Sequence, residues 1–213
     1  LAKDQEAILN KISEYERNIK DEEYEVKRLT KAIGDAKIER NKKLSRNTRT
    51  KKIAFEQKNR PSLVLLTRQS VPVIDRNEYA HFSNIEKGGY IISDCDKPDI
   101  LIFATGSEVW VALEVKKLLL NDFNVKVVNL CCWELFEEQD LNYKKSVLKC
   151  DSKTLLVSIE SGTTDGWQKY TGRFGLNIGI NTFGESGPGA DVAEHFGITP
   201  DNIYNKILKK LDL

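Results

Sequence analysis

The sequence has 213 residues, of which 40% are hydrophobic and 31% are charged, and its net charge is +1. That length has room for one ordinary domain with an appendage, or for two small domains. No apolar run reaches the roughly 18–20 residues of a membrane span, which argues against a membrane protein, and the near-zero charge gives no reason to expect nucleic acid as a partner.

The beginning of the chain and its cysteines bear on its compartment. The opening residues, LAKDQEAILNK, mix acidic and basic groups and lack the apolar centre of a signal peptide, so we expect a cytoplasmic protein. The cysteines are Cys95, Cys131, Cys132 and Cys150. They lack the spacing of zinc ligands, so we expect no metal site and reduced, mostly buried thiols. The sequence contains no methionine, which indicates a fragment, a processed product or a trimmed chain.

The first part of the chain has a heptad pattern. Its apolar residues are Ile8, Ile12, Tyr15, Ile19, Val26, Leu29, Ile33 and Ala36. Their spacing predicts a long helix that pairs with another through this stripe, with Glu22 at an inner position as the weak point. β-branched residues at every second inner position suit a two-stranded parallel coil. The alternative is a helical hairpin that turns at Gly34 and Asp35.

A basic run follows, from Arg40 to Lys52, with seven basic residues and no acidic one. Such a run can bind nucleic acid or an anionic membrane, but it contains no aromatic residue and no base-reading motif. A solvated linker or a continued polar helix is therefore favoured. We predict that residues 1–52 are helical, as a coiled coil with a basic linker.

From Pro61 onward the pattern is that of an α/β protein. Short β-rich runs occur at 62–67, 88–94, 99–105, 125–130, 154–160 and 177–181. Helical stretches are predicted at 108–121, 137–148, 165–172, from about 190, and at 200–211, where Thr199 is the expected N-cap. Strands that alternate with helices predict a three-layer α/β domain with a mostly parallel sheet of about five strands.

The segment ATGSEVW places a turn between a buried strand and a helix. Gly106 permits a sharp turn and Ser107 can cap the helix that begins at Glu108. A dinucleotide site would need three glycines, and Glu108 puts a negative charge where a phosphate would lie. We therefore predict a structural turn, and nucleotide or anion binding is the least favoured hypothesis.

Other candidate groups are equally ambiguous. Gly184, Gly187 and Gly189 form a stiff loop that could receive an anion, but neighbouring carboxylates oppose this. Ser161, Asp165 and His195 could supply a nucleophile and a base, although no Gly-x-Ser-x-Gly elbow is present. Glu160, Asp165 and Glu185 could pair for acid–base work. None of these sets indicates a function by itself.

Several phrases together resemble the carboxyl-terminal end of transketolases. They are PSLVLLTRQ, GGYIISD, PDILIFATGSEVWVALEVKKLL, VKVVNLCCWELFEEQ, SIESGTTDGWQKYTG and IGINTFGESGPGADVAEHFGIT. The resemblance covers about Ile53 to Leu213. It implies that residues 53–87 are a remnant of the pyrimidine-binding domain, with its last strand and a linker, and that residues 88–213 form the C-terminal domain. The preceding helical segment has no counterpart in the family.

The resemblance also implies where the chemistry lies. Transketolases bind thiamine diphosphate and magnesium between two other domains, across a dimer interface, and the motifs for that site have no counterpart in this sequence. We therefore expect no catalytic, cofactor-binding or metal-binding residue in this chain. One residue carries over: Arg68 matches the arginine that contacts the sugar-phosphate substrate, a task that suits a planar guanidinium.

The function implied by the resemblance is that of a transferase domain of the pentose phosphate pathway. The whole enzyme moves a two-carbon ketol unit between sugar phosphates. This chain is expected to be inactive by itself, to form a homo-oligomer, namely a dimer, and to associate with thiamine-diphosphate-binding domains. The alternative is a non-catalytic coiled-coil module for oligomerisation or interaction.

Overall fold

The structure, a computed structural model, describes residues 2–67 and 69–212. Within the first helix, side chains are described at positions 11, 15, 17–34 and 49–56. The chain divides into two compact units, Leu1–Arg49 and Thr50–Leu213. None of the described helices combines the length and apolar character needed to cross a membrane.

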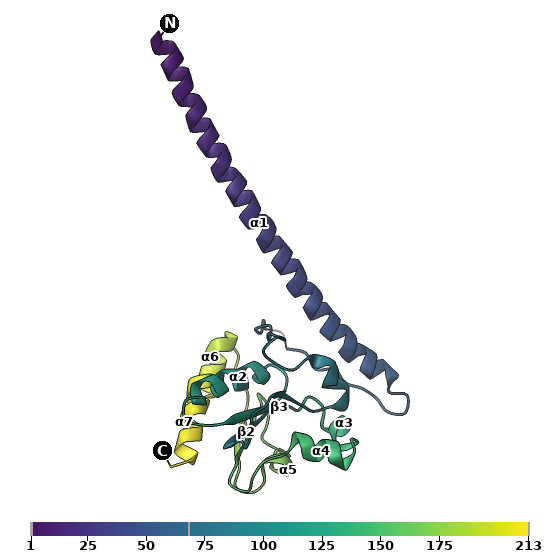
Figure 1. Cartoon of the computed structure of the whole chain (residues 1–213). Coiled ribbons are helices and arrows are strands. Elements are labelled where there is room, and N and C mark those ends of the chain that lie inside the picture. The colour runs from purple at the N-terminus through teal and green to yellow at the C-terminus, as the bar shows by residue number, and fades with distance from the viewer. Residues whose placement is uncertain (1, 68, 213) are drawn as a thin grey trace. The chain divides into compact units, whose positions relative to one another are not determined.

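Helix α1 extends from Ala2 to Glu56 without interruption, and Figure 1 draws it as one continuous helix. The long helix is therefore confirmed, and the hairpin turning at Gly34 and Asp35 is wrong. A single glycine inside a helix costs only about 1 kcal/mol, and no proline interrupts the good helix formers on either side. The basic run Arg40–Lys52 continues the same helix.

The second unit contains a five-stranded sheet. The strands are β1 (Tyr90–Ser93), β2 (Ile100–Ala104), β3 (Val125–Asn129), β4 (Leu155–Ile159) and β5 (Leu176–Ile178). Their order in the sheet is β1-β3-β2-β4-β5, and only the β1–β3 pair is antiparallel. The predicted, mostly parallel sheet of about five strands is confirmed.

Helices cover both faces of this sheet, so the predicted three layers are confirmed (Figure 1). On one face, α2 (Glu108–Leu119) and α7 (Pro200–Lys210) pack on a cluster that includes Ile100 and Ile102. On the other face, α3 (Trp133–Glu137), α4 (Leu141–Val147) and α5 (Gln168–Thr171) pack on Leu101 and Phe103. The alternation of β2 side chains between the two clusters follows from the period of a strand.

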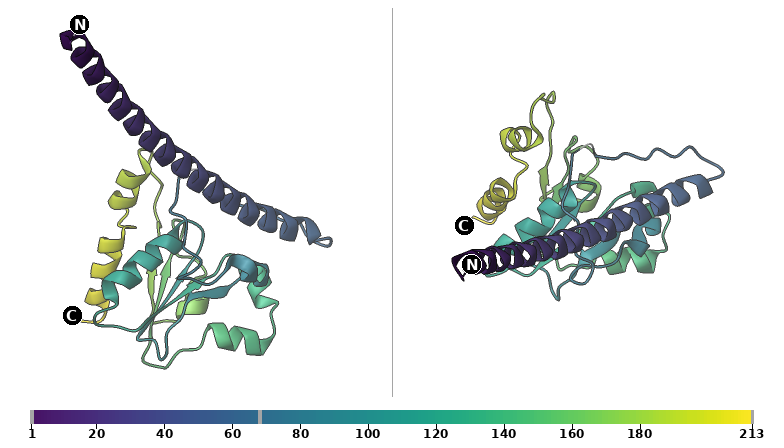
Figure 2. Two further views of the ribbon diagram at one scale, coloured as in Figure 1. Left: turned by 45° about the horizontal axis from the view of Figure 1, so that its top comes forward. Right: turned by 90° about the horizontal axis from the view of Figure 1, so that it is seen from above.

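Two short helices complete the unit. The 3-10 helix η1 spans Phe82–Lys87, and α6 spans Gly189–His195. Figure 2 shows the yellow C-terminal helix α7 beside the teal α2, with α3 and α4 on the other side of the sheet. The carboxyl ends of β2, β3 and β4 share one edge of the sheet, because these strands are parallel.

Two predicted elements differ from the structure. Residues 62–67 form no strand, because no neighbouring strand is available among the described residues, and Leu63 and Leu65 are 84% and 82% exposed. The helix predicted at 137–148 is two helices, α3 and α4. The second begins anew at Asp140, whose carboxylate accepts a hydrogen bond from the backbone N–H of Tyr143 at 2.9 Å.

The predicted caps and thiols also need correction. Ser107 and Thr199 occupy N-cap positions, but neither side chain caps its helix, and the Thr199 hydroxyl is buried without a hydrogen-bond partner in the described part of the chain. The cysteines are not mostly buried. Cys95, Cys131 and Cys132 are half-buried, and Cys150 is exposed, because all four lie just after strands or helices rather than within them.

Candidate functional site

The carboxyl edge of β2 and β4 is the place where this fold could hold a ligand. The two strands are parallel neighbours, and the helices that follow them, α2 and α5, cover opposite faces of the sheet. In open α/β sheets, ligands bind at such a point, in the crevice where the chain direction around the sheet reverses. The residues at this edge therefore decide what the domain can bind.

Glu108 is the central group at this edge. It is the first residue of α2, and its side chain is 6% exposed. Its Oε1 atom accepts hydrogen bonds from the Ser107 hydroxyl at 2.8 Å and from the Ser161 hydroxyl at 2.7 Å. Two hydroxyl donors and the positive end of the helix dipole compensate for burying this carboxyl group.

A second carboxyl group, that of Glu160, directly follows strand β4 and precedes Ser161. Burial and the charge of Glu108 raise its pKa to about 7, although the backbone N–H of Gly162 opposes the shift. Near neutral pH the Glu160 carboxyl is therefore present in both its acid and its ionised form. This pair of acidic groups disfavours a phosphate or diphosphate, whose charge has the same sign.

The predicted candidates do not converge on one catalytic arrangement. Gly106 has a φ of +57°, as a sharp turn requires. The Ser161 hydroxyl donates to Glu108, so it is not prepared as a nucleophile by His195. Asp165 and Glu185 are exposed, whereas Glu160 lies beside Glu108. Arg68, the candidate for contact with substrate, lies outside the described residues.

The described residues offer little to a metal ion or a reactive thiol. Among residues 2–67 and 69–212, no group of three or more His, Cys, Asp and Glu side chains could hold a metal. The Cys131 thiol donates to the Gly88 carbonyl at 3.2 Å, and burial raises its pKa to about 12. A thiol of that pKa is almost entirely protonated at neutral pH and is a poor nucleophile.

Two of the sequence motifs that carry the resemblance meet in an aromatic cluster, on the face of the sheet that α3, α4 and α5 cover. The Trp133 ring lies edge-on to Trp167, with ring centroids 4.9 Å apart, and to Tyr170, at 5.3 Å. Gly166 has a φ of +81°, and a Cβ atom there would lie 2.7 Å from the Trp133 ring. The Gly166-Trp167 pair therefore requires glycine for both its backbone conformation and its fit against Trp133.

Glu137 anchors the polar side of this aromatic cluster. Its Oε1 atom accepts from the Tyr170 hydroxyl at 2.9 Å and pairs with the Lys169 ammonium at 2.9 Å. The hydrogen bond from Lys169 is the largest cause of its lowered pKa, and Tyr170 and Lys144 add to it. These contacts join α3, α4 and α5, which is a structural role.

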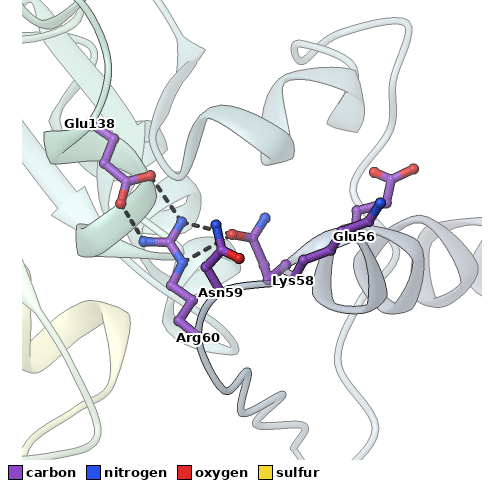
Figure 3. A pocket seen from close by; sticks show the side chains of 6 residues that line it. Glu56, Lys58, Asn59, Arg60 and Glu138 are labelled. Carbon is purple, nitrogen blue, oxygen red and sulfur yellow. Dashed lines mark hydrogen bonds and ion pairs between the residues drawn. The ribbon is translucent and has the colours of Figure 1, made fainter.

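Another polar feature lies where the segment after α1 meets the end of α3 (Figure 3). A shallow hollow of about 480 Å³ is lined by residues 56–60 and Glu138. The Arg60 guanidinium donates to both carboxylate oxygens of Glu138 and to the Gln57 side-chain oxygen. This hydrogen bonding is the main reason that the pKa of Glu138 is lowered. The Arg60 and Glu138 charges are paired with each other, which is a structural role.

These polar contacts were not predicted, since they join residues far apart in the sequence. Ser161 reaches Glu108 across 53 positions, and Arg60 reaches Glu138 across 78. The buried Glu108 had one sequence signal, namely a carboxylate at the first position of a helix that follows a buried strand. That pattern does not show that Ser161 lies opposite.

Comparisons with known proteins agree with this fold. A family model described as "Transketolase-like TK C-terminal domain" matches residues 88–199. The transketolase of Aquifex aeolicus is 47% identical over 160 residues, which are 74% of this chain and 23% of that protein. The transketolase of Bacillus subtilis is 37% identical over 159 residues, or 73% of this chain and 24% of that protein.

Solved structures give the same result. A transketolase variant from Pichia stipitis superposes with a TM-score of 0.61 at 34% identity, covering 68% of this chain and 20% of that one. The Pichia stipitis transketolase in complex with sedoheptulose 7-phosphate has a TM-score of 0.58 at 34% identity, covering 63% and 19%. The chain spans between a fifth and three tenths of the length of the curated relatives that it matches.

Proposed function

Because the chain belongs to the transketolase family through its C-terminal-like domain, we propose that it serves as the C-terminal domain of a transketolase. In this proposal, catalysis takes place in domains outside these 213 residues. The observation that carries it is the match of residues 88–199 to the family model, combined with a match to less than a quarter of the Aquifex aeolicus relative.

The whole enzyme would transfer a two-carbon ketol unit between sugar phosphates, with thiamine diphosphate and a divalent metal supplying the chemistry. The described residues of this chain do not fit that cofactor. The carboxyl edge of the sheet has the acidic pair Glu108 and Glu160 where a diphosphate would need cations, and no metal-ligand cluster exists in the described ranges. No step of the reaction is therefore assigned to the α/β domain.

Arg68 is the residue of this chain that we propose to contact substrate, by binding the phosphate of the sugar. Its bidentate guanidinium suits a phosphate, but a solitary Arg–phosphate pair in water contributes only about 0–1 kcal/mol. Arg68→Ala should therefore leave sugar-phosphate binding by the isolated chain unchanged. In the assembled enzyme it should raise KM for the sugar phosphate, with a smaller effect on kcat.

The segment 62–67 supports association with the catalytic domains. It has a β-rich sequence and no strand partner among the described residues, and Leu63, Leu65 and Leu66 are 84%, 82% and 62% exposed. An extended apolar segment of this kind can add as a strand to the edge of another sheet, with alternate side chains buried in the partner. We propose that this segment binds the pyrimidine-binding domain of the enzyme.

The test is association with separately produced thiamine-diphosphate-binding domains of the Aquifex aeolicus transketolase. The full chain should bind them, as measured by light scattering after size-exclusion chromatography. Leu65→Asp should abolish binding because it places a charge in the apolar contact. Ser62→Asp, in the same exposed segment, is the matched control and should bind more tightly than Leu65→Asp. Absence of binding by the unmodified chain at tens of micromolar would contradict the proposal.

The domain organisation and setting belong to the same proposal. Residues 1–52 would form the helical part with its basic stretch, residues 53–87 the remnant of the pyrimidine-binding domain, and residues 88–213 the C-terminal domain. The assembled enzyme would act as a dimer in the pentose phosphate pathway of the cytoplasm. The alternative, a non-catalytic coiled-coil module, is favoured by one observation, the exposed apolar stripe of α1.

The proposed boundary can be tested with a chain that begins at Glu86. It keeps all five strands and both sheet faces, so it should unfold cooperatively. Its melting temperature should be lower than that of the full chain, because Ile74, Tyr79 and Ala80 pack against the main core cluster. A gradual, non-cooperative transition would show that residues 1–85 are needed to complete the domain.

A further inference from the structure

Helix α1 has an apolar stripe that is exposed in the single chain. The described side chains of this stripe are Tyr15, Ile19, Val26, Leu29 and Ile33, which are between 54% and 63% exposed. In the sequence, Ile8, Ile12 and Ala36 continue the spacing, although their side chains lie outside the described ones. We call this set, together with Glu22, the α1 stripe.

A helix of this kind needs a partner. Helices in proteins gain most of their stability by packing an amphipathic face rather than from the intrinsic propensity of their residues. The α1 stripe runs for about 40 Å, at 1.5 Å per residue from position 8 to position 36. An apolar face that keeps a heptad spacing over this length is the sequence pattern of a coiled coil.

We propose that the α1 stripe binds the same stripe of a second copy of this chain, in a parallel and in-register coiled coil. One argument is the alternation of residue types along the stripe. Ile12, Ile19, Val26 and Ile33 are all β-branched and recur every seven residues, in the layers that begin each heptad. β-branched residues in these layers favour two-stranded parallel pairing.

The charges beside the stripe agree with this pairing. In a parallel coil, the residue before each β-branched layer lies near the residue five positions later on the other chain. Lys11 is then near Glu16 of the other copy, which is an attractive pair. The following pairs are Asn18 with Glu23, Glu25 with Thr30, and Ala32 with Lys37, and none of them joins like charges.

Glu22 is the one charged residue within the stripe. In a parallel, in-register coil it meets Glu22 of the second copy, so this layer repels instead of packing. We infer that Glu22 keeps the association reversible. Glu22→Leu should therefore lower the dimer dissociation constant at least tenfold, as measured by sedimentation equilibrium.

The α1 stripe is tested with two neighbouring substitutions, each of which introduces an aspartate. Val26 lies in the stripe and is 62% exposed, whereas Tyr24 is 68% exposed and lies on the outer face, two residues away. The unmodified chain and Tyr24→Asp should have the mass of a dimer by light scattering. Val26→Asp should have the mass of a monomer, with an unchanged melting temperature of the α/β unit. A monomeric unmodified chain, or a Val26→Asp variant that stays dimeric, would overturn the proposal.

The direction of the two helices is tested by cross-linking. In a parallel, in-register coil, Leu29→Cys lies opposite itself, and oxidised glutathione should join the two copies through a disulfide. Lys31→Cys lies on the outer face and should give no more cross-linked dimer than the unmodified chain with its native cysteines. A Leu29→Cys variant that is dimeric by mass yet not cross-linked would show that the helices are antiparallel. This inference does not depend on the proposed function, since it concerns residues 1–49 alone.

Discussion

The two units of this molecule place the same residue type in opposite environments. Ile100 of β2 is fully buried beneath helices α2 and α7, whereas Ile19 of α1 is 56% exposed. The α/β unit contains its own partners, because each sheet face meets helices from the same unit. The stripe of α1 has a regular apolar spacing and needs a partner. One unit can be stable within a single chain, and the other depends on association.

The largest expected difference comes from deleting one side chain in each unit. Phe103 is 1% exposed and Leu29 is 54% exposed. Phe103→Ala should lower the free energy of unfolding of the α/β unit by about 3–5 kcal/mol, through lost burial and the cavity it leaves. Leu29→Ala should leave that transition unchanged. All three tryptophans, at positions 110, 133 and 167, lie in the α/β unit, so urea unfolding followed by tryptophan fluorescence isolates it.

Circular dichroism of the same two variants reports mainly on α1, the longest helix. Leu29→Ala should lower the helical signal at low protein concentration, because it weakens the association that stabilises α1. If Leu29→Ala lowered the fluorescence-detected transition as much as Phe103→Ala does, the two units would not be independent.

A smaller effect is expected for glycines within the α/β unit. Gly166→Ala should cost about 1–2 kcal/mol for the left-handed backbone, and a further 1–3 kcal/mol for the collision with Trp133. Gly172 also has a positive φ, of +68°, but a Cβ atom there would have no neighbour within 4 Å. Its ψ of −173° lies in a region that is essentially restricted to glycine, so Gly172→Ala should show a backbone cost alone, of about 1–3 kcal/mol. A loss for Gly166→Ala of no more than about 1–2 kcal/mol in thermal unfolding would mean that Trp133 moves aside freely.

The acidic pair at the carboxyl edge predicts a pH effect of about 1 kcal/mol. The pKa of Glu160 in the folded chain, about 7, lies above its ordinary value of 4.5. Between these values the folded chain holds a proton that the unfolded chain releases, so stability falls as pH rises from 4.5 to 7. Glu160→Gln removes this fall and should gain about 1 kcal/mol relative to the unmodified chain at pH 8, after allowance for solvent screening.

The control for this pH profile is Glu185→Gln, since Glu185 is an exposed carboxylate in the loop before α6. Its unfolding free energy should follow the unmodified chain between pH 4 and pH 8. Parallel pH profiles for Glu160→Gln and the unmodified chain would show that the Glu160 carboxyl does not retain its proton.

The contact between Arg60 and Glu138 should give the smallest effect. It is a solvent-exposed ion pair, so Glu138→Gln should leave the melting temperature unchanged. The segment after α1 should nevertheless be held less firmly. We expect faster trypsin cleavage after Lys58, measured by mass spectrometry against the unmodified chain. An unchanged cleavage rate would show that Gln57 and the backbone suffice to hold this segment.

The periodic parts of the molecule could be predicted from the sequence, because their signals are local. The spacing of apolar residues by three and four positions predicted α1, and the short apolar runs predicted β1 to β5. Residues 62–67 have an equally good β-rich sequence, yet they form no strand, since a strand also needs a neighbour to accept and donate its backbone hydrogen bonds. Local sequence does not tell whether that neighbour is present.

The polar contacts of the candidate site could not be predicted for a different reason. Glu108 and Ser161 meet only because β4 lies beside β2, and no residue in either segment specifies that order of strands. The lack of a three-glycine phosphate loop at Gly106 could be seen in the sequence, because such a loop consists of residues that lie close together in the chain. The raised pKa of Glu160 depends on burial and on Glu108, and so required the fold.

Calorimetric titration of the full chain with thiamine diphosphate and magnesium tests whether the cofactor site lies outside these 213 residues, as proposed for a transketolase C-terminal domain. We expect no heat beyond dilution, and no sugar-phosphate turnover above the blank. Saturable binding of thiamine diphosphate in the micromolar range would contradict it.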